Sequence, residues 1–150
     1  MTRAKSVVAA LEALSLPRFL HGHTFATMRR EEKILIVEDN PLIAAAIEKA
    51  GERLNLIAEV ATDGWDAIEK LRTEVYAAIV INADLPRHSG YGVVTYLQEE
   101  NGEQLENVVL MTSADPAAVR ERTSEHLRVI DRTDAVEAIM AALGPERQRQ

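Results

Sequence analysis

Short apolar runs alternate with segments of helical periodicity along the chain from residue 33 onward. Runs of aliphatic residues are typical of strands buried on both faces of a parallel sheet, whereas apolar residues three or four positions apart are typical of a helix with one buried face. Strands are expected at residues 34–37, 56–61, 77–81, 108–111 and 127–130, each followed by a helix. Five such units predict an α/β fold: a doubly wound five-stranded parallel sheet, (βα)5, with helices on both faces.

The helices are expected to bury one apolar face and to begin and end at recognisable residues. Their apolar faces comprise Leu42, Ile43, Ala46, Ile47, Ala50 and Leu54, then Ala67, Ile68 and Leu71, then Val93, Val94 and Leu97, and finally Ile139, Met140 and Leu143. Asp115 precedes Pro116, the pattern of an N-cap acid followed by proline in the first helical turn. Asp134 and Glu137 have capping-box spacing, so the last helix is expected to begin there and to end before the Gly-Pro pair at 144–145.

The distribution of charge divides the chain near Arg30. Residues 1–30 hold five Lys or Arg and one acid, although the whole chain carries a net charge of −7. A change of sign of this size indicates a boundary. We therefore expect an N-terminal extension over residues 1–30, helical or disordered, then a folded domain over 31–144 and a tail over 145–150.

The extension contains one short amphipathic stretch. The residues that share its helix face are Val7, Leu11 and Leu14. Pro17 would end this helix, because proline removes a backbone donor. The basic, acid-poor composition fits a transit peptide, while a secretory signal fits poorly because Glu12 interrupts the apolar centre. We favour a third interpretation, a segment outside the fold, in which case Met28 is a natural start.

Composition narrows the class of protein. Of 150 residues, 47% are hydrophobic and 27% are charged, which is ordinary for a globular domain. The chain has no cysteine, which excludes disulfides, thiolate metal sites and thiol nucleophiles. No apolar run approaches the ~20 residues needed to cross a bilayer. The net charge argues against general binding to nucleic acid, so neither a membrane nor a nucleic acid is an expected partner.

Polar residues follow four of the five expected strands. In a doubly wound sheet, ligands bind outside the carboxyl ends of the strands, so these residues define the candidate site. They are Glu38 and Asp39 after the first strand, Asn82 and Asp84 after the third, Thr112 and Ser113 after the fourth, and Asp131 and Arg132 after the fifth. Two adjacent acids repel each other, and a hard cation such as Mg²⁺ would relieve that repulsion. No glycine-rich loop follows the first strand, which argues against a nucleotide-binding cradle.

Four segments in this order resemble the receiver domain of bacterial response regulators, the CheY-like family. They are residues 33–41 (KILIVEDNP), residues 61–71 (ATDGWDAIEKL), Leu85-Pro86 with Gly90, and residues 109–115 (VLMTSAD). The resemblance extends over residues 33–143. It implies a CheY-like, flavodoxin-related fold and a site where a histidine kinase transfers a phosphoryl group to an aspartate that ends the third strand.

The resemblance also assigns roles to the other residues of the candidate site. Glu38 and Asp39 match the acid pair that binds Mg²⁺ in the family. Ser113 matches the hydroxyl that contacts a phosphoryl oxygen, and Thr112 is the alternative one position away. Mg²⁺ is therefore the one cofactor that the resemblance implies.

Of the positions that depart from the family pattern, two bear directly on the chemistry. Asn82 falls at the phospho-acceptor position, and an amide is a very poor nucleophile because its nitrogen lone pair is delocalised into the carbonyl. The loss of one negative charge there also predicts that Mg²⁺ binds weakly. Arg132 stands where the family has lysine, which keeps the positive charge but changes its reach and geometry. The scaffold is retained, and the sequence predicts that the phosphorylation chemistry is disabled.

Three hypotheses of function follow. We favour a stand-alone receiver-like signalling module that acts by protein–protein interaction, without enzymatic activity and without aspartate phosphorylation. The alternative is an active phospho-receiver that uses Asp84 or another acceptor. A small flavodoxin-like enzyme is a third, opposed by the missing phosphate loop and the scarcity of ring-stacking aromatic residues. The expected partners are a histidine kinase, another signalling protein or a second copy in a homodimer, and the expected location is the cytoplasm.

Overall fold

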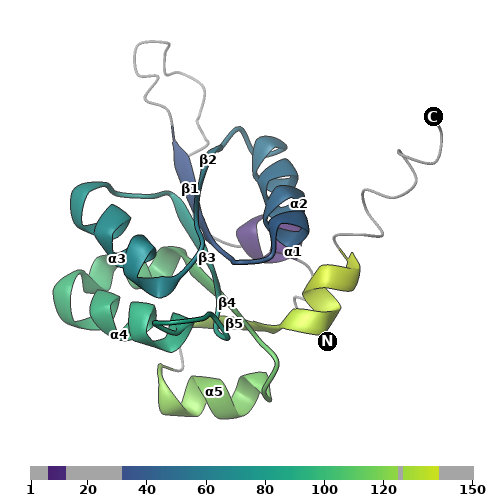
Figure 1. The fold of residues 1–150 in the computed structure, drawn as a ribbon. Coiled ribbons are helices and arrows are strands. Elements are labelled where there is room, and N and C mark those ends of the chain that lie inside the picture. The colour runs from purple at the N-terminus through teal and green to yellow at the C-terminus, as the bar shows by residue number, and fades with distance from the viewer. Residues whose placement is uncertain (1–6, 13–31, 125–126, 139–150) are drawn as a thin grey trace, which may run out of the picture.

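A five-stranded, all-parallel sheet forms the centre of the molecule (Figure 1). The structure is a computed structural model that describes residues 7–12, 32–124 and 127–138. The strands are β1 (Lys33–Val37), β2 (Ile57–Ala61), β3 (Ala78–Asn82), β4 (Val108–Thr112) and β5 (Arg128–Asp131). Their order in the sheet is β2-β1-β3-β4-β5. This arrangement confirms the predicted doubly wound sheet, with strand boundaries within one residue of those expected.

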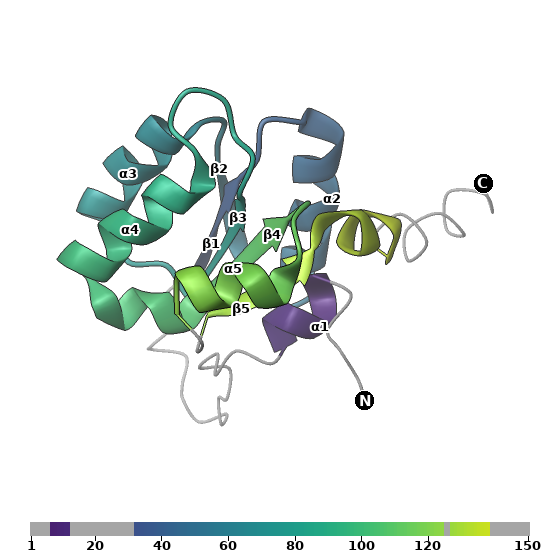
Figure 2. The same ribbon diagram turned by 90° about the horizontal axis from the view of Figure 1, so that it is seen from below.

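Helices cover both faces of the sheet (Figures 1 and 2). They are α1 (Val7–Glu12), α2 (Pro41–Glu52), α3 (Gly64–Thr73), α4 (Gly90–Glu100), the 3-10 helix η2 (Gly102–Asn107), α5 (Pro116–Arg122) and a helical segment at 132–138. One buried cluster joins α1, α2 and the start of the segment at 132–138 to the sheet, and a second joins α3, α4 and α5 to its other face. Among the described residues, no helix has the length and apolar character to cross a membrane.

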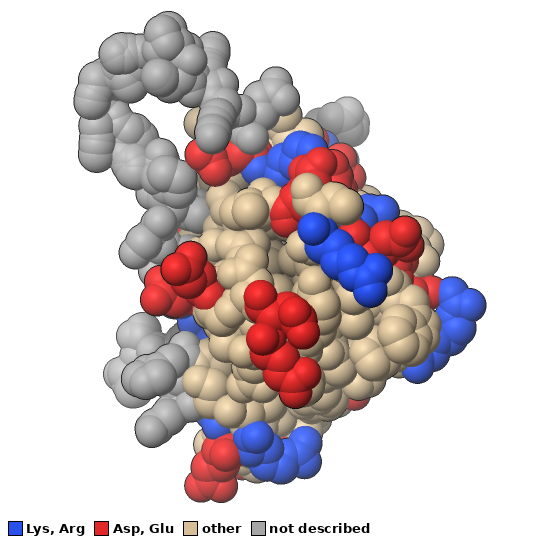
Figure 3. All heavy atoms as spheres, turned by 90° about the vertical axis from the view of Figure 1, so that its left-hand side faces the viewer, with Lys and Arg blue, Asp and Glu red and all other residues tan. Residues whose placement is uncertain are grey.

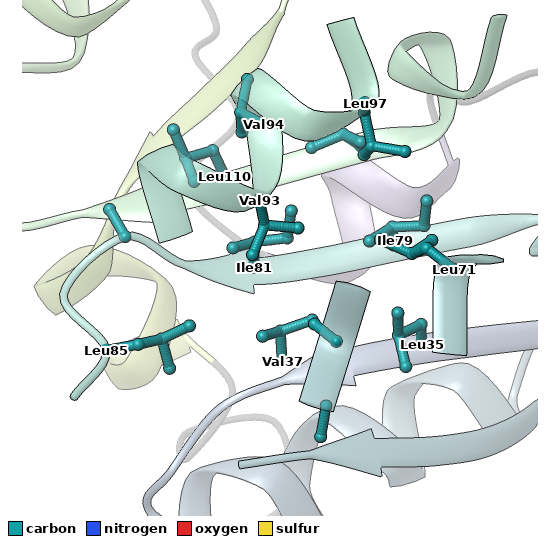
Figure 4. Packing of buried hydrophobic residues seen from close by; sticks show 14 of the residues in the cluster. Leu35, Val37, Leu71, Ile79, Ile81, Leu85, Val93, Val94, Leu97 and Leu110 are labelled. Carbon is teal, nitrogen blue, oxygen red and sulfur yellow. The ribbon is translucent and has the colours of Figure 1, made fainter. Parts of the chain in front are cut away.

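The two central strands β3 and β4 are buried along their whole length. Successive strand residues point to opposite faces, so each strand contributes to both clusters. Figure 4 shows one of them, in which Leu35 and Val37 of β1 and Ile79 and Ile81 of β3 lie against helix residues such as Val93. Burial on both faces explains why these strands are continuous apolar runs rather than alternating ones. The polar residues that follow them are thereby held at one edge of the sheet.

The helices agree with the sequence except in the start of the last helix and in the buried face of α2. Asp115 caps α5 as predicted, and its side chain accepts a hydrogen bond from the Ala117 amide. The prediction that the last helix begins at Asp134 is wrong, because β5 extends to Asp131, whose Oδ1 accepts from the Asp134 amide at 3.0 Å. That helix therefore already includes residues 132–134. Its predicted apolar residues and its end, at 139–145, lie outside the described residues.

Leu42 is the second difference, since 71% of its surface is exposed. It was expected on the buried face of the helix that became α2. At 3.6 residues per turn, it projects far from the direction shared by Ile43, Ile47 and Ala50, which are all buried. The buried face of α2 therefore begins at Ile43.

The N-terminal helix α1 packs against the domain, contrary to the expectation of a segment outside the fold. Ala10 and Leu11 are fully buried and belong to the same cluster as β1, α2 and β4. Figure 2 shows α1 beside α2 and below the sheet. The physical reason is that α1 contacts β4 and α2, so that its apolar residues join the buried cluster on this face of the sheet. A boundary drawn from composition does not reveal such contacts. Leu14, Pro17 and Met28 lie outside the described residues.

Candidate functional site

Glu38 is buried at the carboxyl end of β1, with 1% of its surface exposed. Its amide continues the strand ladder by donating to the Ala61 carbonyl at 3.0 Å. Its carboxylate turns back and accepts from the Asn40 amide at Oε2, at 3.0 Å. Asn40 is the N-cap of α2 and accepts from the amide of Leu42 at 2.9 Å. The turn from β1 into α2 therefore fixes the position of Glu38, while the neighbouring Asp39 is exposed.

Asn82 ends β3 directly beside this acid pair and is 2% exposed. Its Nδ2 donates to Glu38 Oε2 at 3.4 Å and to Asp39 Oδ1 at 3.5 Å. Its Oδ1 accepts from the Asp84 amide at 2.9 Å. Because a backbone amide is always a donor, this last contact fixes the orientation of the side-chain amide. The two hydrogens of Asn82 Nδ2 face the acids, and its carbonyl oxygen faces away from them.

Arg132 contacts the same acid from the end of the edge strand β5. It follows β5, three strands away from β1 in the sheet order, and its Nη2 lies 2.9 Å from Glu38 Oε2. The Arg132 side chain is 24% exposed and that of Glu38 is 0% exposed. The second carboxylate oxygen, Glu38 Oε1, and Arg132 Nε are buried with no hydrogen-bond partner among the described residues.

Burial sets the electrostatics of Glu38. Removal from water raises the pKa of this carboxyl, and the repulsion from Asp39 adds to that effect. The Asn40 amide and the Arg132 guanidinium oppose the rise in pKa by stabilising the charged form. A buried carboxylate is costly unless it is paired and hydrogen-bonded. Glu38 has both kinds of compensation, and all of it converges on Oε2.

The two candidate hydroxyls after β4 differ in burial. Thr112 is fully buried, and its Oγ1 lies 3.0 Å from the Tyr91 hydroxyl and accepts from the Ala114 amide at 3.0 Å. Ser113, the hydroxyl that the resemblance favours, is exposed. In the described part of the chain, neither hydroxyl is hydrogen-bonded to Asn82 or to the acid pair. The structure thus gathers Glu38, Asp39, Asn82 and Arg132 into one contact network and leaves Ser113 outside it.

The loop that follows β3 is fastened to the start of α3, which the sequence did not predict. Arg87, with φ 61°, forms an ion pair with Asp63, the N-cap of α3. This guanidinium, together with the Asp66 amide, lowers the pKa of the Asp63 carboxyl. Trp65 stacks on His88 with ring centroids 4.2 Å apart. These contacts join residues more than 20 positions apart, so no local pattern could have indicated them.

The pocket presents hydrogen-bond donors where a cation would need ligands. Mg²⁺ is held by oxygen ligands in near-octahedral geometry, but Asn82 directs its NH₂ group and Arg132 its guanidinium toward Glu38. Among the described residues, no group of three or more His, Cys, Asp or Glu could hold a metal ion. The side chains, as arranged, do not fit the Mg²⁺ that the sequence suggested at Glu38 and Asp39.

Comparison with protein families gives one match that covers most of the chain. The model of the response regulator receiver domain matches residues 34–140. Among curated proteins, the transcriptional activator protein IrlR of Burkholderia pseudomallei is 30% identical over 88 residues, which are 59% of this chain and 37% of that protein. The response regulator mcs4 of Schizosaccharomyces pombe is 37% identical over 60 residues, 40% of this chain and 12% of that protein. The chain thus spans well under half the length of either relative.

Solved structures share the fold at low sequence identity. The receiver domain of the Francisella response regulator 1452 superposes with a TM-score of 0.61 at 19% identity, covering 79% of this chain and 98% of that one. The receiver domain of the sensor histidine kinase PA1611 of Pseudomonas aeruginosa gives a TM-score of 0.57 at 21% identity, covering 77% and 99%. A magnesium ion is coordinated in the active-site cleft of that domain.

Proposed function

The chain belongs to the response regulator receiver domain family, whose members are modules of two-component signalling. Since it does, we propose that it acts by protein–protein interaction without aspartate phosphorylation. The observation that carries this proposal is the residue at the acceptor position. Asn82 lies in the pocket beside Glu38 and Asp39, and its side chain is an amide. Its proposed role is structural, because it satisfies the two acids instead of attacking phosphorus.

The environment of Asn82 supports this proposal. A nucleophile in phosphoryl transfer needs a free electron pair directed at the incoming phosphorus. The amide nitrogen has no free pair, and its hydrogens are used by the acids. The carbonyl oxygen accepts from the Asp84 amide at 2.9 Å. The amide nitrogen is therefore unavailable for attack, and the carbonyl oxygen is turned away from the acids toward the Asp84 amide.

The surface near the pocket supports a role in binding another protein. Leu42 is 71% exposed and Trp65 is 60% exposed, and both lie in the first turns of helices that follow β1 and β2. These helices begin at the carboxyl edge of a parallel sheet, the edge that holds the pocket. A histidine kinase or another signalling protein would find apolar contacts there. Figure 3 shows basic side chains interspersed with acidic ones over the side that carries α3 and α4, which suits a protein partner better than a polyanion.

The test of this proposal is direct. The purified protein and its Asn82→Asp variant are incubated with Mg²⁺ and acetyl phosphate, and the intact mass of each is recorded. The proposal expects no phosphoryl adduct on the wild-type chain. An adduct on the wild type would refute it, and the Asp84→Ala variant would then show whether the exposed Asp84 is the acceptor, because loss of the adduct would identify it.

A further inference from the structure

We infer that the guanidinium of Arg132 takes the place of a divalent cation in this pocket, so that the domain is held in one arrangement without metal. The inference rests on the proposed function and deepens it. Phosphoryl transfer in this pocket would need a nucleophile at position 82 and a divalent cation at the acid pair. The proposed function rests on the missing nucleophile, and the present inference rests on the missing cation. It follows that replacing Asn82 with aspartate would restore only one of the two.

One carboxylate oxygen of Glu38 is saturated with hydrogen-bond donors. Glu38 Oε2 receives the Asn40 amide at 3.0 Å, Arg132 Nη2 at 2.9 Å and Asn82 Nδ2 at 3.4 Å. Three donors on one oxygen use its lone pairs fully. A metal ion that bound this oxygen would have to displace at least the guanidinium, because a cation and an arginine repel each other. Glu38 Oε1 has no hydrogen-bond partner among the described residues, but it belongs to the same carboxylate, so a cation there would meet the same repulsion.

The neighbouring ligand position is occupied by Asn82. An asparagine can bind a hard cation only through its carbonyl oxygen. The oxygen of Asn82 is turned to the Asp84 amide, and the NH₂ group faces the acids. Rotating the amide by half a turn would break the Asp84 contact and would direct an oxygen toward two carboxylates. The hydrogen bonds therefore hold Asn82 in the orientation that excludes a metal.

The fold itself holds the guanidinium in place. Arg132 opens the helical segment at 132–138, whose first turn is capped by Asp131 and whose Ala135 is fully buried in the core. An arginine is charged at every pH that a folded protein meets. The Arg132–Glu38 pair therefore supplies a permanent positive charge to the acid pair and joins the end of β1 to the start of the last helix. In this structure the pocket and the C-terminal helix are coupled without any ligand.

The test measures metal binding directly, with Mn²⁺ as the probe because bound Mn²⁺ loses the electron paramagnetic resonance signal of the free ion. The wild type, Arg132→Gln and the double variant Asn82→Asp/Arg132→Gln are titrated. We expect the wild type to leave the Mn²⁺ signal unchanged and Arg132→Gln to bind Mn²⁺ at least about tenfold more tightly, because a positive charge has left the pocket. The double variant should bind more tightly still, since it adds a third carboxylate.

Arg120→Gln is the matched control. Its guanidinium is half-buried and donates to the Val129 carbonyl at 3.3 Å, away from the acids, so its loss should leave the Mn²⁺ titration unchanged. If the wild type binds Mn²⁺ as tightly as Arg132→Gln, or if neither Arg132 variant binds it, the inference is wrong. Phosphorylation of the wild type by acetyl phosphate is a separate result, and it would overturn the proposed function instead.

Loss of stability in the Arg132 variants does not weaken the test. Removal of one partner from a buried ion pair is destabilising, so thermal unfolding of Arg132→Gln is followed with and without Mn²⁺. The inference expects the metal to raise the melting temperature of this variant and not that of the wild type. A variant that stays unfolded at millimolar Mn²⁺ would show that a cation cannot take the place of the guanidinium, and would overturn the inference.

Discussion

Replacement of Asn82 by aspartate should destabilise the fold, because it places a third carboxylate beside two others. The substituted oxygen would lie about where Asn82 Nδ2 now lies, 3.4 Å from Glu38 and 3.5 Å from Asp39. At an effective dielectric constant of about 20, two negative charges at this separation repel by roughly 5 kcal/mol. The attraction of Arg132 offsets part of this repulsion. If the remaining repulsion exceeded about 4 kcal/mol, the new carboxyl would take up a proton at pH 7 instead, because protonation of an aspartate with an unperturbed pKa near 3.9 costs about that much at this pH. The loss of unfolding free energy is therefore limited to about 4 kcal/mol.

We therefore expect Asn82→Asp to lose about 2–4 kcal/mol of unfolding free energy at pH 7. With an m-value of about 2 kcal/mol per molar urea, the urea midpoint should fall by roughly 1–2 M. The sign of the pH dependence follows from the neighbours, which raise the pKa of the new carboxyl in the folded state. The variant should therefore approach the stability of the wild type as the pH falls to about 4 and below, where the carboxyl becomes protonated in the unfolded state as well as in the folded one.

The measurement is urea unfolding of both proteins at neutral and acidic pH, in the absence of divalent metal. Asn101→Asp is the control, because Asn101 is exposed and its side chain makes no capping hydrogen bond; it should cost under about 1 kcal/mol. A midpoint for Asn82→Asp equal to or above that of the wild type at pH 7 would refute the reasoning. It would mean that the neutral amide does not relieve repulsion within the pocket.

Three further substitutions test the fold by urea unfolding. Leu11→Ala should lose about 2–4 kcal/mol, because Leu11 is fully buried, and an unchanged midpoint would show that α1 does not dock. Tyr76→Phe should lose about 1–3 kcal/mol, because the Tyr76 hydroxyl donates to Glu59 at 2.7 Å. Burial raises the pKa of Tyr76, and the hydrogen bond to Glu59 raises it further. The wild type should therefore lose stability above about pH 10, where the unfolded tyrosine ionises. The phenylalanine variant should not show that loss. Gly64→Ala should lose about 1–3 kcal/mol, since its Cβ would overlap the His88 carbonyl, and wild-type stability would contradict this.

Much of the fold could be predicted from the sequence because the signals are local. The aliphatic runs at 34–37 and 108–111 can be buried on both faces only in the interior of a sheet. The N-cap at Asp115 followed by proline also acts within a single helical turn. The helix start at Asp134 was wrong because Asp131 offers the same spacing to the Asp134 amide, and the choice between them depends on where the edge strand β5 ends.

Four residues of the candidate site could be placed together from the sequence, since strand ends in a parallel sheet meet at one edge, but Ser113, expected with them, is exposed and makes none of their contacts. Glu38, Asp39, Asn82 and Arg132 do form one network. Their pairing was not predictable, because it depends on side-chain directions across the whole sheet. No local pattern indicated a partner for Arg132, and the structure pairs it with the buried Glu38.

The sequence by itself determined the α/β architecture, the edge of the sheet that holds the site and the absence of a carboxylate at position 82, because each follows from residue type and local order. Only the tertiary structure decided that α1 docks on the core through Leu11 and that the amide of Asn82 turns its donors toward the acids. It also decided that the Arg132 guanidinium meets Glu38, 94 positions away in the chain. The physical reason is common to all three: burial and hydrogen-bond direction arise from contacts between distant segments, and those contacts exist only once the sheet has formed.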